Sequence, residues 1–487
     1  MSPKMHEMFN CLEPATVWRH FSTLCSIPRQ SKQEEQLRDH LLTWAASLGL
    51  CAAVDQAGNL IIRKPASPGK ECVPAVVLQA HLDMVCQKNA DSAHDFARDP
   101  IVPVERDGWL VAEGTTLGAD NGIGAALILA VLEDTTLSHG PIEALFTVDE
   151  EAGMGGARGL AGDSLQGRLM LNLDTEDWGE FYLGCAGGLD VNVERSALGE
   201  PLPAGWQVFS LQLRGLRGGH SGVDIHEERG NAIKLLVRVL RSLEKRFAIR
   251  LASLKGGTAR NALPREAFAS IAVAPGHEEQ ICAALNELQE ESRGELLGID
   301  EGLQLELATS SAEQVLAQVE QNLWLAALHA APHGVYRMSR RVPGVVETSN
   351  NLGIVDLAPN GGSCNFMVRS LRDSGAQALA DEIGSLFELA ACSVEMSGHY
   401  PGWAPNPASP LLALSQRVFT REFCGESAVK VIHAGLECGI IGAKYPGMDT
   451  VSFGPNIRGA HAPGERVEVA SVSKCWKLLT AIMAEIH

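Results

Sequence analysis

The fold is indicated most directly by Val76-Val77-Leu78-Gln79-Ala80-His81, an apolar run that ends at a histidine. A short apolar run of this kind predicts a buried strand. Residues 142–148 and 169–173 are similar runs, and residues 121–134 between the first two runs carry apolar side chains at helical spacing. This alternation of strand and helix predicts an α/β domain with a mixed or largely parallel sheet flanked by helices.

Imidazole and carboxylate side chains follow these strands or open the helix: His81, Asp83, Asp120, Glu150, Glu151, Asp174 and His461. Because α/β sheets bind ligands beyond the carboxyl ends of their strands, we expect these groups to meet. Taken singly, each has a structural alternative: Asp120, for example, suits a helix N-cap. Together they form a donor set for zinc or another divalent metal, with a spare glutamate to serve as general base.

Composition narrows the possible partners of the chain. Its 487 residues suffice for two or three domains, and its 40 basic against 59 acidic residues give a net charge of -19. Such acidity argues against nucleic acid as a partner. The first ten residues show no secretory signal, and the longest apolar stretch, residues 123–132, is too short to span a membrane. The 12 scattered cysteines indicate reduced thiols. We therefore predict a cytoplasmic protein without a membrane partner.

The middle of the chain has a different pattern from its ends. Glycines at 184–188 predict a hinge, after which strands and long helical patterns, including residues 312–331, indicate an α+β insertion. The α/β pattern then returns. We predict a catalytic domain in two parts, 1–188 and 398–487, around an inserted domain at 189–397. No internal repeat of fixed period is visible.

Several motifs resemble the metallopeptidase family of carboxypeptidase G, aminoacylase and peptidase T. The resemblance rests on His81-Leu82-Asp83-Met84-Val85, Gly118-Ala119-Asp120-Asn121-Gly122, Glu150-Glu151-Ala152-Gly153-Met154, Asn172-Leu173-Asp174 and Gly454-Pro455 to His461. Gly218-Gly219-His220-Ser221-Gly222, Tyr400-Pro401-Gly402-Trp403 and the segment His433 to Gly439 resemble dipeptidases of that family more narrowly. The resemblance runs almost end to end.

The resemblance implies a role for each group of the predicted metal site. Asp120 would bridge two divalent metal ions, with His81 and Asp174 completing one site and Glu151 and His461 the other. Glu150 would be the general base, and Asp83 would orient His81. Zinc suits these ligands best, and manganese or cobalt also fits.

The resemblance also assigns residues to the substrate. His220 would polarise the scissile carbonyl, within its own chain or across a dimer, and Asn261, Arg369 and Glu437 would bind the substrate. Each has an alternative: His220 as a turn histidine, Arg369 in a strand-edge salt bridge, Glu437 as a brace for its glycine-rich turn. The inserted domain would be a lid that also forms a homodimer.

The reaction implied is hydrolysis of dipeptides, especially aminoacyl-histidine dipeptides such as carnosine, by metal-activated water. A related hydrolase, an N-acyl-amino-acid deacylase or a carboxypeptidase, is the first alternative. A catalytically inert binding or scaffold protein on the same fold is the second, and retention of every predicted ligand argues against it.

Overall fold

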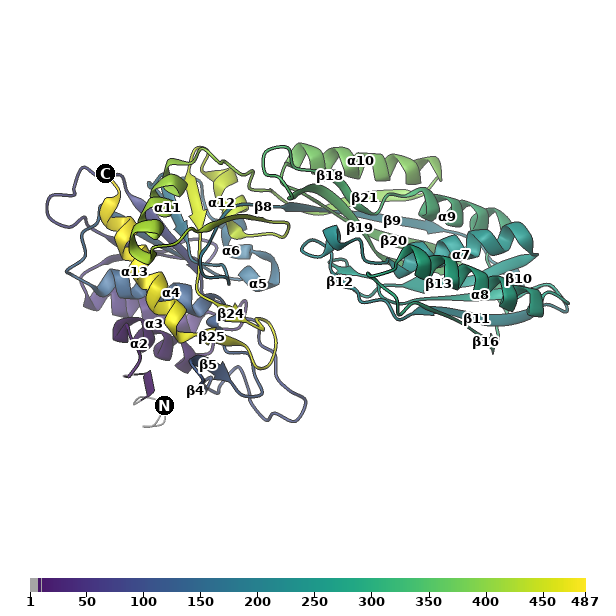
Figure 1. Cartoon of the computed structure of the whole chain (residues 1–487), viewed down its shortest axis with the longest axis horizontal. Helices are drawn as coiled ribbons and strands as arrows, with labels where there is room; N and C mark the ends of the chain where they lie inside the picture. Colours follow the sequence, from purple (N-terminus) through teal and green to yellow (C-terminus); the bar gives the residue numbers. More distant parts are fainter. Residues whose placement is uncertain (1–7, 10) are drawn as a thin grey trace. The chain divides into compact units, whose positions relative to one another are not determined.

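The computed structural model describes residues 8, 9 and 11–487 and forms two compact units (Figure 1). The first unit contains the chain up to Gly184, Pro405–Val431 and Leu436–His487. The second contains Cys185–Ala404 and the short segment Ile432–Gly435. The predicted boundaries are 188/189 and 397/398, and the predicted catalytic part includes the segment 432–435.

The first unit is built on a sheet with the order β1-β2-β6-β3-β7-β23-β8-β22. Its centre is parallel: β3 (Val76–His81) pairs with β6 (Ile142–Thr147) and with β7 (Leu169–Asn172), and β7 pairs with β23 (Asp449–Ser452). The outer strands are β1 (Cys51–Val54), β2 (Leu60–Lys64), β8 (Glu180–Cys185) and β22 (Ala428–Ile432). Antiparallel pairing at both ends makes the sheet mixed, which confirms the predicted fold class.

Helix α4 (Ala119–Glu133) is the central helix of the first unit, lying against β3 and α2 (Ala15–Ser26). Its residues from Ile123 to Leu132 are all buried, because a helix that is apolar on every side needs cover all round. The other helices of this unit are α3 (Glu35–Ser47), α5 (Glu150–Gly153), α6 (Gly155–Gly159), α11 (Pro410–Phe423), α12 (Glu437–Lys444) and α13 (Val469–Glu485). A small sheet joins β4 (Pro103–Arg106), β5 (Trp109–Ala112), β24 (Ile457–Arg458) and β25 (Arg466–Glu468).

The second unit is a single large sheet with the order β16-β11-β15-β13-β19-β20-β9-β21, and β18 (Gly334–Met338) also pairs with β19. Its strands are β9 (Gly187–Ser196), β11 (Gln207–Arg214), β13 (Ile249–Gly256), β15 (Ala267–Val273), β16 (Gln304–Ser310), β19 (Val346–Ala358), β20 (Gly361–Ser370) and β21 (Ser393–Tyr400). Its helices are α7 (Ala232–Arg246), α8 (Glu278–Glu295), α9 (Gln318–Ala330) and α10 (Asp373–Leu389). Apolar residues of these helices and strands share one hydrophobic core.

Two β-α-β-β-α-β modules make up this second sheet. The first is β11-α7-β13-β15-α8-β16, and the second is β9-α9-β19-β20-α10-β21, with the first inserted after β9. Numbered within each module, the strands have the order 4-1-3-2 in the first and 2-3-1-4 in the second. This is the ferredoxin-like arrangement, repeated. The modules join antiparallel through β13 and β19, so the second strand of one pairs with the second strand of the other.

The glycines of the expected hinge, where the boundary between the two units falls, also have a packing role. Gly187 and Gly188 are buried at the start of β9, which lies between β20 and the edge strand β21. A Cβ on Gly187 would lie 2.5 Å from the carbonyl oxygen of Tyr400, and one on Gly188 would meet the Tyr400 ring at 2.4 Å. These glycines therefore allow two segments to pack closely.

The expected helix over residues 312–331 begins later, at Gln318. Residues before it are extended, because β17 (Gln314–Val315) pairs with β10 (Glu200–Pro201). The remaining short elements are β12 (Gly219–His220), β14 (Ala262–Leu263) and the 3-10 turn η1 (Ile225–Glu227).

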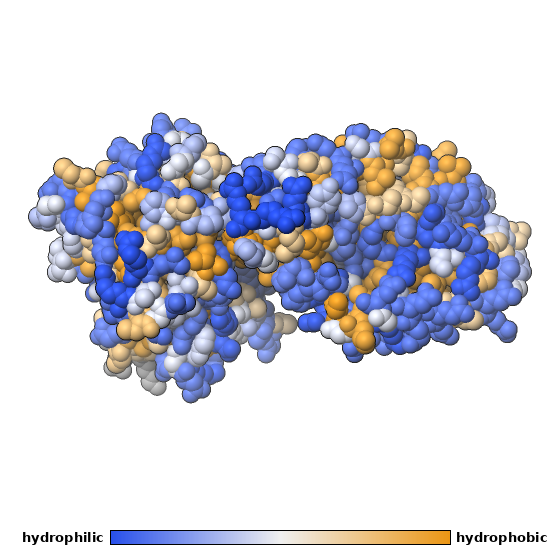
Figure 2. Space-filling view, turned by 45° about the horizontal axis from the view of Figure 1, so that its top comes forward, coloured by the Kyte–Doolittle hydropathy of each residue, from blue (hydrophilic) through white to orange (hydrophobic). Residues whose placement is uncertain are grey.

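Within the described part of the chain, no helix is both long and apolar enough to cross a membrane. The cysteines, all of which lie in the described part of the chain, form no disulfide. Hydrophilic residues cover most of the face seen in Figure 2, where apolar residues form scattered patches.

Candidate active site

The five predicted metal ligands lie together at the carboxyl ends of the parallel strands of the first unit. They form two overlapping groups, His81 with Asp120 and Asp174, and Asp120 with Glu151 and His461. The two oxygens of Asp120 face different histidines: Oδ1 is 3.2 Å from His81 Nε2, and Oδ2 is 3.2 Å from His461 Nε2. Asp174 Oδ1 lies 3.3 Å from His81 Nε2, and Glu151 Oε1 lies 3.1 Å from His461 Nε2.

These separations fit metal coordination. A tetrahedral ion with bonds of about 2.0–2.1 Å holds its ligand atoms about 3.3 Å apart. Glu151 Oε1 and Asp174 Oδ1 are buried and face the Nε2 atoms of His461 and His81, so an ion could take the place of the proton between each pair. Asp120 belongs to both groups and is therefore the residue placed to bridge two ions.

The side chains of this ligand cluster shift one another's pKa values strongly. Burial lowers the pKa of His81, but Asp174, Asp120 and Asp83 outweigh it and hold that pKa well above its usual value. Hydrogen bonds with Asp120 and Glu151 raise the pKa of His461 to about 11. Burial raises the pKa of Asp174 to about 6. Without ions, protons on the two imidazoles offset part of the negative charge; a metal would replace those protons.

Glu150 lies within the same cluster. One of its oxygens lies within 4.8 Å of ligand atoms of His81 and Glu151. Burial, together with the charges of Asp174, Glu437 and Glu151, raises its pKa well above the usual value. A buried carboxyl with a raised pKa next to a metal site has the properties of a general base or acid. Its position alone leaves open a role as a ligand.

Asp83 organises more of the site than the predicted contact with His81. Its Oδ1 lies 3.4 Å from His81 Nδ1 and accepts the backbone N–H of Glu150 at 3.0 Å. Its Oδ2 accepts the N–H of Glu151 at 3.1 Å and the hydroxyl of Ser31 at 2.7 Å. Burial would raise the pKa of Asp83, but the hydrogen bond with His81 and the other donors lower it to about 2. The ionised Asp83 thus fixes the first imidazole and both glutamates.

Glu437, predicted to bind substrate, lies close enough to the metal cluster for its charge to act on Glu150. Its side chain is fully buried, and Oε2 accepts hydrogen bonds from Gln79 Nε2 at 2.7 Å and Thr147 Oγ1 at 2.5 Å. Burial raises its pKa to about 8. Gln79 in turn bonds to Asn172, which bonds to Ser452, so a buried polar chain crosses neighbouring strands. This geometry supports the alternative role for Glu437, a brace beneath the site.

The second unit holds a separate cluster around Arg369, at the end of β20. The guanidinium is only 4% exposed. It donates to Tyr400 Oη at 2.8 Å and Ser221 Oγ at 3.4 Å, and Nη2 lies 3.4 Å from His220 Nε2. None of these partners is negative, so the salt bridge considered for Arg369 is not what holds it. A buried charge with neutral partners is costly and suits an anionic ligand.

His220 presents a second donor beside Arg369. Its Nδ1 accepts the backbone N–H groups of Gly222 at 3.2 Å and Val223 at 3.0 Å, which assigns the ring proton to Nε2. Burial and the charge of Arg369 lower the pKa of His220 to about 4, so the ring is neutral near pH 7. Nε2–H and Nη2–H then face each other without an acceptor between them. An oxygen of a ligand would satisfy both.

Two further residues belong to this region: Asn261, which was predicted to bind substrate, and His433, which was not predicted as a site residue. Asn261 is exposed, and its backbone carbonyl accepts the N–H of Ser221 at 2.8 Å. His433 is buried, bonds through Nε2 to Ser349 Oγ at 2.7 Å, and has a pKa lowered to about 3 by burial and by Arg369. Tyr400 and His433 fall inside motifs recognised in the sequence, but no spacing rule indicated their contacts.

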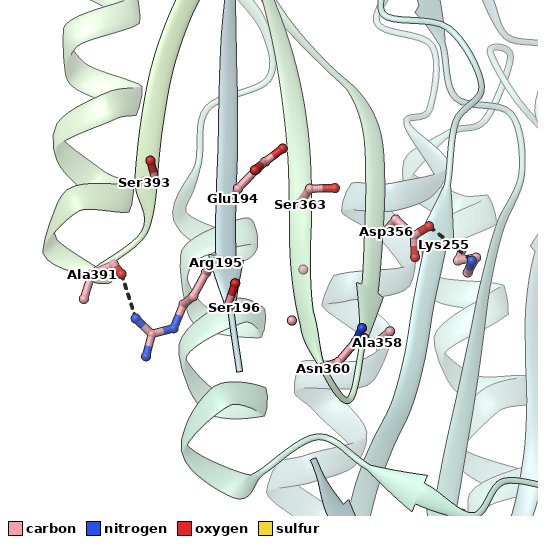
Figure 3. Close-up of a pocket in the computed structure, with 12 residues that line it drawn as sticks. Glu194, Arg195, Ser196, Lys255, Asp356, Ala358, Asn360, Ser363, Ala391 and Ser393 are labelled. Atoms are coloured by element: carbon pink, nitrogen blue, oxygen red, sulfur yellow. Dashed lines mark hydrogen bonds and ion pairs between the residues drawn. The ribbon is translucent and has the colours of Figure 1, made fainter. Parts of the chain in front are cut away.

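Figure 3 shows a hollow on the sheet of the second unit, with a volume of about 720 Å³. Its two basic side chains are already paired: Arg195 with Glu320 and the carbonyl of Ala391, and Lys255 with Asp356. None of the predicted site residues lines it. This hollow therefore lacks the unsatisfied charge of the Arg369 cluster.

An α/β unit that gathers two imidazoles and several carboxylates around a shared aspartate has the donor set and spacing of a two-metal hydrolase. The chain matches the model of Peptidase family M20/M25/M40 over residues 77–485. It belongs to this family and is a peptide hydrolase.

Relatives cover nearly the whole chain. The cytosol non-specific dipeptidase of Escherichia coli (strain K12) is 46% identical over 476 residues, which span 98% of both chains. The crystal structure of aminoacylhistidine dipeptidase from Vibrio alginolyticus is 43% identical, with a TM-score of 0.91 over 100% of this chain and 99% of that one. The aminopeptidase PepT from Bacillus cereus ATCC 10987 shares the fold at 18% identity and a TM-score of 0.58, with 98% and 99% coverage.

Proposed function

We propose that the chain is a metal-dependent dipeptidase that hydrolyses dipeptides, including aminoacyl-histidine dipeptides such as carnosine. The observation that carries this proposal is the pair of ligand groups sharing Asp120. The dipeptidase names of the two relatives above 40% identity support the substrate class.

When bound, two divalent ions would polarise the scissile carbonyl and make a water molecule nucleophilic. His81 and Asp174 would hold one ion, Glu151 and His461 the other, with Asp120 between them. Zinc suits this set of nitrogen and oxygen donors, and manganese or cobalt also fits. Asp83 orients the His81 ring, since its carboxylate lies against Nδ1 and leaves Nε2 directed at the ligand cluster.

Glu150 would take a proton from the attacking water and deliver it to the leaving amine. Its backbone N–H donates to Asp83, which fixes the point from which the Glu150 side chain extends. This assignment separates two adjacent glutamates: Glu151 as ligand and Glu150 as base.

The Arg369 cluster would bind the free carboxylate of the dipeptide. A guanidinium forms two parallel hydrogen bonds with a carboxylate, which favours very short peptides over proteins. His220 would donate Nε2–H to a substrate oxygen, and Asn261 would contact the peptide backbone. Because His220 and Arg369 of one chain lie 3.4 Å apart, we favour His220 acting together with the Arg369 of its own chain.

We further propose that the second unit is a lid and that the chain forms a homodimer in the cytoplasm. The cytosolic relative supports the location. Sedimentation analysis tests the dimer directly; a single species with the mass of one chain at micromolar concentration would remove it.

A substrate panel tests the activity. Purified protein is stripped with a chelator, reloaded with Zn²⁺, Mn²⁺ or Co²⁺, and assayed with Ala-His, carnosine, Ala-Ala, a tripeptide and N-acetyl amino acids. We expect rapid cleavage of dipeptides only after reloading. Robust deacylation without dipeptide cleavage would favour the deacylase alternative, and normal metal loading without any turnover would favour the inert scaffold.

A further inference from the structure

The ligand His461 stands on an exposed loop between β24 and β25. Its side chain is 51% exposed, and its backbone has φ 64°, in the left-handed region that residues with a Cβ rarely adopt. Gly459 and Gly464 on either side also have positive φ, at 70° and 90°. An exposed loop in this conformation does not by itself hold an imidazole in place for a metal, so other contacts must fix it.

Glu465, four residues after His461, makes those contacts. It is 2% exposed and accepts four consecutive backbone N–H groups: those of Leu117 at 2.8 Å, Gly118 at 2.9 Å, Ala119 at 2.7 Å and Asp120 at 3.2 Å. Successive N–H groups that converge in this way form an anion-binding nest. Here the anion comes from the loop that carries His461, and the nest from the segment that carries Asp120.

The Asp120 segment depends on such support. Asp120 opens α4 with φ -81° and ψ 114°, which is outside the helical region, so the helix does not set the direction of its carboxylate. The Thr115 carbonyl also accepts the N–H of Gly464 at 3.2 Å, and the Glu465 carbonyl accepts the N–H of Ala112 at 3.4 Å. Side-chain and backbone bonds together dock the His461 loop on this segment.

A matching contact holds the other side of the same segment. The buried guanidinium of Arg29 donates to the carbonyls of Gly118 at 2.5 Å, Leu82 at 2.8 Å and Asp83 at 3.0 Å. Arg29 thus ties the Asp120 segment to the His81 segment through carbonyls, while Glu465 ties it to the His461 loop through N–H groups. Arg29 therefore stabilises the side of the ligand cluster that contains His81, and Glu465 stabilises the side that contains His461.

From this arrangement we infer that Glu465 is a positioning residue for the metal site formed by Asp120, Glu151 and His461. The inference rests on the proposed dinuclear function. Glu465 touches neither substrate nor the predicted ions. It acts by fixing the distance between His461 and Asp120, and its loss should weaken one of the two ions selectively.

The test is a metal titration of the stripped protein with Zn²⁺ against a chromogenic chelator, comparing wild type with Glu465→Gln. Glutamine keeps the shape of the side chain but loses an oxygen acceptor for two of the four N–H groups. We expect wild type to bind two ions tightly and E465Q to keep one tight ion while the other binds about 10–100-fold more weakly. The spectrum of Co²⁺ bound at the weakened site should also change.

Glu143→Gln is the matched control. Glu143 is 4% exposed and accepts the backbone N–H groups of Gln166 at 2.7 Å and Gly167 at 2.8 Å, so it has a similar structural role away from the ligands. E143Q should lower thermal stability while both ions bind as in wild type. If E465Q does not fold, Glu465→Asp, which keeps the charge on a shorter side chain, is titrated in its place.

The outcomes are distinct. Unchanged binding of both ions by E465Q, or equal weakening of both, would overturn the positioning role. Failure of the proposed function has a different signature: wild type itself would bind no ions or would cleave no dipeptide.

Discussion

The two units each bury a cluster of ionisable groups, and the clusters have opposite charge. In the first unit, carboxylates such as Asp120, Asp174 and Glu151 surround two imidazoles. In the second, the Arg369 guanidinium meets only neutral partners, including His220 and Tyr400. In the first cluster, protons on the two imidazoles offset only part of the negative charge, and in the second no carboxylate is among the hydrogen-bond partners of Arg369. Because buried charge is costly without a partner, each cluster indicates the charge of its ligand: metal ions for the first and a carboxylate for the second.

The largest effect is expected at the residue shared by both metal groups. Asp120→Ala should deplete both ions and reduce turnover by at least about 10⁴-fold, because one substitution removes a ligand from each site. Elemental analysis after gel filtration measures the metal content. Asp300→Ala is a control, since Asp300 is a buried aspartate that accepts backbone N–H groups of the second unit. Full occupancy of D120A would contradict the bridge.

A smaller loss should follow removal of the proposed base. Glu150→Ala should lower kcat by about 10²–10⁴-fold while both ions remain, because proton transfer is lost but no ligand is removed. Steady-state kinetics and metal analysis of the same preparation check both statements. Loss of an ion from this variant would reassign Glu150 as a ligand and extend the anionic cluster.

The cationic cluster should respond through KM rather than through metal content. Arg369→Ala should raise KM for free dipeptides about 10–100-fold and matter little for amidated dipeptides, since a charged hydrogen-bonded pair contributes about 1.5–3 kcal/mol. Arg195→Ala is the matched control because the charge of Arg195 is already paired with Glu320. Equal damage to both kinds of substrate would remove Arg369 from carboxylate recognition.

The pH dependence of metal binding offers the finest test. In the metal-free protein the His461 pKa is raised to about 11 and the His81 pKa well above its usual value, so both imidazoles carry protons at pH 7.5. A metal requires neutral imidazole; binding should release about two protons per chain, and affinity should rise as pH rises towards 11. Calorimetry in buffers of different protonation enthalpy counts the protons. Arg369→Ala should leave the count unchanged, and a wild-type count of zero would show that both imidazoles were already neutral.

Much of the first unit could be predicted because its signals are local. The strand ending at His81 and the helix after Asp120 both appear within two residues of their predicted ends. Apolar periodicity follows directly from burial, and parallel strands bring the side chains that follow them to one edge of the sheet. Apolar periodicity and the shared edge of parallel strands are therefore sufficient to predict that these ligands lie together.

The contacts of Glu465 and Glu437 with distant segments could not be predicted from local sequence patterns. Glu465 meets the Asp120 segment from 345 residues away, and Glu437 meets Gln79 from 358 residues away. A glutamate in a loop looks the same in sequence whether it binds four N–H groups or only water. For the same reason the packing role of Gly187 had no local signal: its lack of a side chain allows the close approach of Tyr400.

The sequence by itself determined the kind of chemistry, because the residue types and their positions after strands fixed a metal-binding donor set and an arginine suited to carboxylates. Only the tertiary structure decided how those groups are arranged. It divided the ligands around Asp120, gave Arg369 neutral partners, and revealed two β-α-β-β-α-β modules in a chain without a visible repeat. The physical reason is that module order and charge pairing depend on contacts between distant segments, which the local pattern of side chains does not encode.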